Sequence, residues 1–169
     1  MADESIRLIP LGRSGKHAIV DAQDFEALTS LACWHVNSQG YARRSFTRAM
    51  RCGEVKLPFL MHRIVMGALG EQEVDHVNGN RLDNPRCNLR FATYAQNRMN
   101  IPKFHGKFAS RFKGVTWHKQ HQKWYACISI NKTSKFLGLF AQEEDAARAY
   151  DIAAIEHFGE FARINFNAA

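Results

Sequence analysis

Side chains that could carry chemistry gather in one stretch of the sequence, EVDHVNGNRLDNPRCNLRFATYAQN, between residues 73 and 97. The stretch contains the dipeptide Asp75-His76 and five asparagines, at positions 78, 80, 84, 88 and 97. Hydrolysis of a phosphodiester needs a water molecule, a base that takes its proton and a cation beside the developing negative charge. A histidine that titrates near neutral pH is such a base, and Asp75 and Asn97 offer oxygen ligands that favour Mg²⁺ or Mn²⁺.

A structural interpretation of the same residues stands beside this one. Asparagine-rich turns form because asparagine tolerates a left-handed backbone, and a lone histidine beside an aspartate is commonly a surface pair or a satisfied core residue. Adjacent side chains on a regular strand also point to opposite faces, so Asp75 and His76 serve one centre only where the strand ends. The turn of residues 78–80, Asn-Gly-Asn, predicts such an end. Asn88, on the returning strand, either holds this loop or orients the imidazole.

The elements that would position these residues are short. EVDHV and NLRFA are predicted as two strands, and TYAQNRMN as a helix that begins at Thr93, because Thr93 and Gln96 form a capping box. Asn97 then lies on the first turn of this helix and faces back toward the strands. Upstream, Pro58 is well placed to begin a helix over FLMHRIVMGAL, which Gly67 or Gly70 would end.

The pieces D-H, N-G-N, D-N, N-L-R and Q-N occur in the order and at the intervals typical of one family. The stretch resembles the signature of the HNH endonucleases, members of the His-Me finger (ββα-metal) superfamily, and MHRIVMG is similar to the H-R helix of their phage and homing members. The resemblance implies that His76 is the general base, that Asp75 and Asn97 hold a single metal ion and that Asn88 braces the active loop. It also implies cleavage that leaves a 5′-phosphate and a 3′-hydroxyl.

This sequence departs from many relatives by placing Asn97 where they carry a third histidine. The identity of the metal is therefore less constrained than the base. In the upstream helix, Arg63 is a candidate phosphate contact, with helix capping or packing as the alternative. His62 is not expected to bind the metal, because the constellation already has its ligands.

The placement of charge indicates a polyanionic partner. The net charge is +7, and no acidic residue occurs between Asp83 and Glu143, whereas eleven arginines and lysines do. A solvated surface normally mixes both signs, so this segregation favours nucleic acid. Aromatic residues are interleaved with the cations in a strand-like pattern, and membrane binding would instead favour a basic amphipathic helix.

Downstream of Pro102 the sequence predicts three strands, GVTWH, KWYACISI and KFLGLF, and a helix from about Gln142 to Phe158. Three acidic residues lie in the first turn of that helix and Gly159 is a natural C-terminal cap. The pieces K-G-V, K-W, L-G-x-F, E-x-A-A-R-A-Y-D-x-A-A, F-G and I-N-F resemble the plant ethylene-response-factor (Apetala-type) DNA-binding domain over residues 110–167. That resemblance implies a three-stranded antiparallel sheet, backed by one helix, that lies in the DNA major groove.

The candidate DNA contacts comprise Arg63, Arg90 and a set on the predicted sheet. That set is Lys113, Trp117, Lys119, Lys123, Trp124, Lys132 and Lys135. Lysines there are expected to contact phosphate, and for each tryptophan core packing is an equal alternative. Several base-reading arginines of the plant domains correspond here to Thr116, His118, Ser129 and Ser134, so the plant target sequence is not carried over.

Together these features predict an α+β protein: an N-terminal mixed β segment, a ββα-metal HNH unit, and a C-terminal three-stranded antiparallel sheet packed on one helix. The expected domains are a mostly β support region at 1–57, the HNH nuclease unit at 58–101, a linker at 102–109 and the DNA-binding domain at 110–169. The expected function is that of a DNA endonuclease of the homing or free-standing phage type, with one Mg²⁺ or Mn²⁺ ion per active site. The alternative is a non-catalytic DNA-binding regulator that retains an HNH fold.

The expected partner is double-stranded DNA, with no membrane, and the chain is expected to be a monomer, with a dimer as the alternative. No apolar stretch approaches the ~18 residues that span a bilayer, and the N-terminus has no apolar signal core, so an intracellular location, in a bacterium or a phage-infected cell, is expected. Four cysteines, at 33, 52, 87 and 127, lie far apart without CxxC spacing. This pattern argues against structural zinc and predicts reduced, buried thiols.

Overall fold

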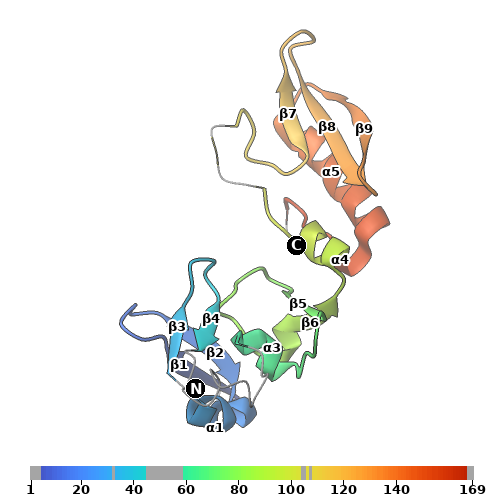
Figure 1. The fold of residues 1–169 in the computed structure, drawn as a ribbon. Helices are drawn as coiled ribbons and strands as arrows, with labels where there is room; N and C mark the ends of the chain where they lie inside the picture. The colour runs from blue at the N-terminus through green and yellow to red at the C-terminus, as the bar shows by residue number, and fades with distance from the viewer. Residues whose placement is uncertain (1–4, 32, 45–58, 104–105, 107, 167–169) are drawn as a thin grey trace. The chain divides into compact units, whose positions relative to one another are not determined.

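The computed structural model describes residues 5–31, 33–44, 59–103, 106 and 108–166, and it divides into two compact units, residues 1–97 and 98–169 (Figure 1). Helices and small antiparallel sheets make up both units, so the α+β class is confirmed. In the part of the chain that the structure describes, no helix is long and apolar enough to cross a membrane.

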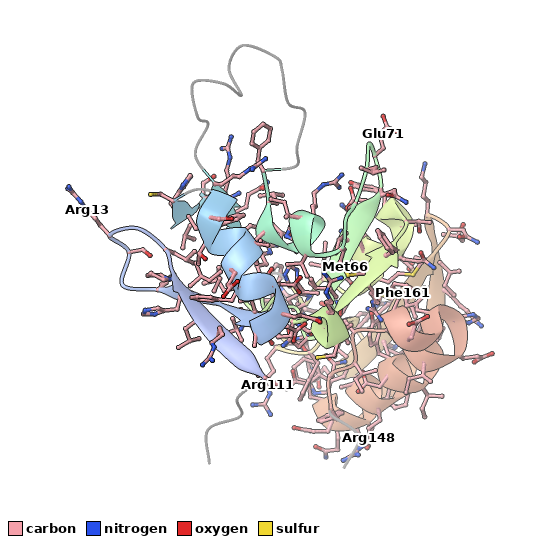
Figure 2. All side chains as sticks on the ribbon, turned by 90° about the horizontal axis from the view of Figure 1, so that it is seen from below. Arg13, Met66, Glu71, Arg111, Arg148 and Phe161 are labelled. Carbon is pink, nitrogen blue, oxygen red and sulfur yellow. The ribbon has the colours of Figure 1, made fainter. Side chains whose placement is uncertain are left out.

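The first unit begins with two β-hairpins and a helix. Strands β1 (Ile6–Pro10) and β2 (His17–Asp21) pair antiparallel, and helix α1 (Ala22–Leu31) follows directly. Strands β3 (Trp34–Val36) and β4 (Ala42–Arg44) form the second hairpin. Its turn is closed by Asn37, whose Oδ1 accepts hydrogen bonds from the backbone N–H groups of Gln39 and Tyr41 at 3.0 and 2.9 Å. Figure 2 shows Arg13, in the β1–β2 turn, pointing away from this unit.

The second part of this unit is a ββα arrangement. Helix α3 (Met61–Val65) is followed by strand β5 (Glu73–His76), a 3₁₀ turn, η1 (Arg86–Asn88), strand β6 (Leu89–Ala92) and helix α4 (Tyr94–Met99). β5 and β6 pair antiparallel in the register Glu73↔Ala92, Val74↔Phe91, Asp75↔Arg90, His76↔Leu89. Both predicted strands are confirmed.

The start of helix α4 and the end of helix α3 can be compared with the predictions from sequence. Thr93 and Gln96 form the capping box, with Thr93 N donating to Gln96 Oε1 at 2.8 Å and Gln96 N donating to Thr93 Oγ1 at 3.2 Å. Helix α3 is shorter than predicted and ends before Gly67, whose φ of +63° takes the chain out of the helical conformation. Pro58, the predicted start, lies outside the described residues.

One hydrophobic core joins both parts of the first unit. Its buried members include Ile9 and Trp34 from the hairpins, Met61 from α3 and Leu89 from β6. The backbone of β2 also bonds to the loop before η1: Ile19 N donates to Leu82 O and Asn84 N donates to Ile19 O, each at 2.8 Å. The N-terminal hairpins therefore fix the loop that follows β5.

The second unit is a sheet backed by one helix. Strands β7 (Val115–His118), β8 (Lys123–Ile130) and β9 (Thr133–Phe140) form an antiparallel sheet in that order. Helix α5 (Glu143–Phe158), followed by the 3₁₀ turn η2 (Gly159–Phe161), packs on one face (Figure 1). Ala146 and Ala147 of α5 are fully buried against Val115 and Ala126, because small side chains let helix and sheet approach closely.

Three of the cysteines fall within the described residues. Cys33, Cys87 and Cys127 are free thiols, as expected. Cys33 and Cys87 are exposed, however, so the expectation that they pack as buried hydrophobes was wrong. Cys33 follows α1 and Cys87 lies within the turn η1. The side chains of such short connections commonly face solvent.

Candidate functional site

His76 closes strand β5 and is almost completely buried, at 3% exposure. Its Nε2 lies 3.2 Å from Oδ1 of Asn84, itself fully buried and held by β2 through its backbone. Burial lowers the pKa of His76, against smaller raising effects of the Asn84 hydrogen bond and of the charges of Asp75 and Asp83. The imidazole is thus neutral at pH 7. In the tautomer that donates to Asn84, Nδ1 is the basic nitrogen.

Asp75 precedes His76 on β5 and is held from the neighbouring strand β6. Its Oδ2 accepts hydrogen bonds from Nε and from the terminal nitrogen of Arg90 at 3.0 and 2.8 Å, directly across the strand pair. Both side chains are largely buried, at 7% exposure for Asp75 and 13% for Arg90. Arg90, a predicted DNA contact, therefore forms an ion pair with Asp75, the predicted metal ligand.

Asn97 faces back from α4 toward β5. Its amide nitrogen Nδ2 donates a 2.8 Å hydrogen bond to Oε2 of Glu73. A carboxylate can only accept, so this bond fixes which end of the amide faces Glu73 and turns the oxygen Oδ1 the other way. Asn97 and Asp75 are thus held by different partners.

The donor types suit a hard divalent cation. Asp75 has two carboxylate oxygens, of which Oδ2 accepts from Arg90, and Asn97 presents its amide oxygen away from Glu73. Within the described ranges, no group of three or more His, Cys, Asp or Glu side chains is arranged for a metal ion. A cation at this place would therefore rest on one carboxylate, one amide oxygen and water, which suits Mg²⁺ better than zinc.

Asn88 closes the loop between β5 and η1. Its Oδ1 accepts from Asn78 N at 3.0 Å, and its Nδ2 donates to Asn78 Oδ1 at 3.0 Å and to Asp83 O at 2.7 Å. The side chain therefore bonds both ends of the loop. Of the two roles considered from the sequence, these contacts correspond to holding the loop rather than orienting His76.

Two residues that sequence reasoning did not assign to the site surround His76. The rings of His62 and His76 lie edge to face with centroids 4.9 Å apart, and Tyr41 lies 5.0 Å from His62 and 5.9 Å from His76. Burial, followed by the charges of His76 and Arg63, lowers the pKa of His62 to about 3. The H-R helix pattern pointed to His62, whereas no pattern in the hairpin turn marked Tyr41.

A pocket of about 330 Å³ adjoins this cluster. It is lined by Gln39, Tyr41, Leu60, His62, Arg63, Glu73, Val74, Arg81 and Asn97. The guanidinium of Arg81 lies 4.7 Å over the ring of Tyr41 and donates to Gln39 O. Arg63 donates to Gln72 O and, at 2.7 Å, to Gly70 O, so its guanidinium also holds the loop before β5.

The predicted DNA contacts of the second unit lie in different places. Lys113 is turned inward: Nζ donates to the carbonyls of Met99 and Ile101 at 2.7 Å each, and burial lowers its pKa to about 8. Lys135 Nζ lies 3.4 Å from His157 Nε2, on the side of the sheet that carries α5.

The tryptophans and the remaining lysines complete this picture. Trp117 and Trp124 face each other across β7 and β8, edge to face at 4.9 Å, and Trp124 packs on the core while Trp117 is 37% exposed. Lys119, Lys123 and Lys132 are exposed. These three lysines are the predicted cations whose positions suit contact with an external polyanion.

The sheet face turned away from α5 carries a row of rings that the sequence had not assigned. We call His118, Tyr125 and Phe136 the outer ring row. His118 and Tyr125 are stacked with centroids 6.2 Å apart, and Tyr125 lies 5.0 Å from Phe136, which is 54% exposed. Their positions alternate along the strands with Trp124 and Ala126, which face the helix.

Comparison with known proteins places the chain beside two kinds of relative. No family model matches. The chain is 29% identical over 166 residues, 96% of its own length and 82% of the other's, to a protein of Acanthamoeba polyphaga mimivirus described as an uncharacterized HNH endonuclease. It is 50% identical over 60 residues to the AP2-like ethylene-responsive transcription factor PLT2 of Arabidopsis thaliana, and 46% identical over 61 residues to CRL5, a factor of the same description from Oryza sativa.

These matches differ in extent. The plant matches cover 34% and 35% of this chain, and the chain spans only about a tenth of the length of those relatives, 11% and 10%. The viral match covers nearly all of both proteins at a lower identity. The chain is thus similar over almost its whole length to a viral protein described as an HNH endonuclease, and over about a third of it to AP2-like factors.

Proposed function

We propose that this protein is a metal-dependent DNA endonuclease of the HNH type, of the kind found as homing or free-standing phage enzymes. One observation carries the proposal: a buried, neutral His76 at the end of β5, with Asp75 beside it and Asn97 on the helix that closes the ββα unit. The viral relative described as an HNH endonuclease supports it, and the AP2-like relatives support DNA as the ligand.

In this proposal the chain supplies the base and its positioning. His76 takes a proton from the attacking water at Nδ1, while its Nε2–H stays on Asn84. Asn88 keeps the loop closed, and Glu73 orients the amide of Asn97. Asp75 and Asn97 would hold one Mg²⁺ or Mn²⁺ ion, which when bound supplies positive charge beside the phosphate. The products are a 5′-phosphate and a 3′-hydroxyl.

The stoichiometry of cutting follows from the number of sites. One site cuts one strand, so a monomer nicks duplex DNA. A double-strand break needs a dimer or two successive cuts.

The rings of His62 and Tyr41 lie against His76 and keep water from this side of the imidazole, which maintains the neutral form of the base.

The test is conversion of supercoiled plasmid to the nicked form with Mg²⁺, comparing the unmodified chain with His76→Ala. Because the base contributes roughly 10²–10⁴-fold to such reactions, His76→Ala should lose nicking by that factor. His17→Ala is the matched control, since His17 is an exposed histidine of the same unit, on β2, and should leave the rate unchanged. Equal nicking by the unmodified chain and His76→Ala would eliminate His76 as the base.

A second function, a DNA-binding regulator that does not cut, is favoured by one observation. Arg90 already neutralises Asp75 at 2.8 Å, a contact that a structural carboxylate would keep and a metal ligand has to share. The same assay separates the two: duplex binding without nicking in Mg²⁺ or Mn²⁺, across varied DNA, identifies the regulator. Nicking that depends on His76 identifies the nuclease.

A further inference from the structure

The outer ring row lies on a sheet face that α5 leaves uncovered. Val115, Ala126 and Ile128 pack against the helix, so the residues that alternate with them point the other way. The register places Tyr125 opposite Thr116, and Phe136 opposite Cys127. The rings therefore run across three neighbouring strands of one face, in contact at 6.2 and 5.0 Å.

The surroundings of the row are polar and cationic. Lys123 pairs with His118 in the register, and Lys132 lies in the turn between β8 and β9. Ser129 and Ser134 pair with each other further along the same face. No acidic residue occurs from position 84 to position 142, so this face has no carboxylate of its own strands to repel a phosphate. Phe136 is exposed, with His118 and Tyr125 half-buried beside it, and this row of rings inside a cationic rim suits a ligand with a charged exterior and an apolar feature.

Duplex DNA offers such a feature only at thymine. In the major groove, thymine presents a C5-methyl group, which apolar side chains contact, whereas guanine is read by bidentate arginine or lysine. The strands VTWH, KWYACISI and TSKFLGLF contain no arginine. Lysine is the side chain left on this face that can make the guanine contact, and we assign Lys123 and Lys132 to phosphate, while Phe136 and Tyr125 can meet a methyl group.

We propose that the outer ring row reads thymine methyl groups in the major groove, so that this unit prefers A·T-rich duplex DNA. The inference rests on the proposed function, because it takes DNA as the ligand, and it specifies how that DNA is selected. Lys119, Lys123 and Lys132 bind phosphates and set the register, and the rings select the base pairs. Each methyl group contacted contributes about a four-fold gain in affinity, the value of one buried apolar carbon.

The experiment removes the methyl group alone. The full chain is titrated in EDTA, which prevents cutting, with alternating poly(dA–dT) and poly(dA–dU) duplexes, which differ only at C5 of the pyrimidine. The expected result is binding at least about four-fold tighter to the dA–dT duplex. Adding a methyl group should act in the same direction, so poly(dG–5-methyl-dC) should bind more tightly than poly(dG–dC).

Variants assign the effect to the row. Phe136→Ser should abolish the preference for dA–dT over dA–dU, whereas Ile155→Ser, which removes a comparably exposed apolar side chain (56%) from α5, should keep it. Thermal unfolding of both variants checks that the fold is retained. A preference that survives in Phe136→Ser would overturn the assignment to the row.

The remaining outcomes separate this inference from the proposed function. Equal affinity for the two duplexes overturns methyl reading but leaves DNA binding intact. Tighter binding to single-stranded poly(dT) and poly(dU) than to either duplex also overturns it, because the rings would then stack on bases instead. Failure to bind any DNA overturns both proposals. Loss of nicking alone, with the dA–dT preference retained, counts only against the nuclease.

Discussion

The amide nitrogen of Asn97 donates a 2.8 Å hydrogen bond to Oε2 of Glu73, across the gap between α4 and β5. Glu73 is thereby the group that decides which atom of Asn97 faces the proposed metal. A carboxylate accepts but does not donate, so it holds Nδ2 and leaves the oxygen on the opposite side. The orientation of a proposed ligand is thus set by a residue that has no role of its own in the chemistry.

Replacing Glu73 should therefore change metal dependence more than maximal rate. Glu73→Ala frees the amide of Asn97 to rotate, and loss of such a supporting contact typically weakens metal affinity about 10–100-fold. We expect the Mg²⁺ concentration for half-maximal nicking to rise by that factor. Glu73→Gln should recover most of the effect because its amide oxygen still accepts from Asn97. Glu71→Ala, an exposed carboxylate before β5, is the control. An unchanged Mg²⁺ midpoint in Glu73→Ala would refute the role.

His62 predicts how the first unit responds to acid. Its pKa is lowered to about 3 in the folded chain, chiefly by burial, while the unfolded side chain titrates near 6.5. The unfolded state therefore takes up a proton that the folded state refuses, and the stability present above pH 6.5 is lost as pH falls toward 3. From this residue, the free energy of unfolding should fall by up to about 1.4 kcal/mol per pH unit.

His76 adds to the same trend, because burial lowers its pKa as well. Removing His62 alone should thus reduce, but not abolish, the slope of the free energy of unfolding against pH. His62→Phe keeps a ring beside Tyr41 and cannot titrate, so its free energy of unfolding should fall less steeply between pH 6.5 and 4.5. Urea unfolding at several pH values measures this. The same slope in both proteins would contradict the assignment.

The sequence predicted the local structure well, because local structure depends on neighbouring residues. The Thr93–Gln96 capping box, the β5–β6 pair and the three strands with one helix all follow from patterns within about ten residues. Helix α3 ends before Gly67, one of the two glycines expected to end it, and Arg63 then bonds the carbonyls of the loop that follows. The apolar pattern of MHRIVMG does not reveal those contacts of Arg63.

The site was only partly predictable, because it depends on which side chains tertiary packing brings together. Tyr41 reaches His76 from a separate hairpin, and Lys113 turns inward to the carbonyls of Met99 and Ile101. A lysine inside a basic segment resembles every other lysine in sequence. Lys113 precedes β7, so the turn before the sheet decides the side it faces, and no strand pattern shows this.

Gly114 is predicted to be irreplaceable in the second unit. An added Cβ would lie 1.9 Å from a ring carbon of Tyr150, and φ is +77°, a conformation that only glycine adopts without strain. Gly114→Ala should therefore destabilise by about 1–2 kcal/mol from the backbone and a further ~1–3 kcal/mol from overpacking. Gly159→Ala, at φ +52° and ψ −128°, adds backbone strain with nothing within 4 Å of the new Cβ, so it introduces no overpacking. Thermal unfolding of both variants should show the larger loss for Gly114→Ala, and equal losses would mean that Tyr150 moves aside freely.

Asp151 ties the end of the second unit to α5. Its carboxylate, 8% exposed, accepts from Asn165 N at 2.8 Å, Asn165 Nδ2 at 2.9 Å and Phe166 N at 2.9 Å, and Asn165 in turn bonds both backbone groups of Lys113. Asp151→Ala removes the acceptor of these half-buried N–H groups, while Asn165 Nδ2 keeps its bond to Lys113 O, and each N–H group that water does not reach then costs about 1–3 kcal/mol. Asp151→Asn should also destabilise, because its amide nitrogen would face an N–H group. Asp145→Ala, in the exposed first turn of α5, should lose at most about 1 kcal/mol of helix-dipole stabilisation. If chemical denaturation gave the same loss for Asp151→Ala as for Asp145→Ala, the carboxylate would not be what holds residues 165–166 and the backbone of Lys113 in place.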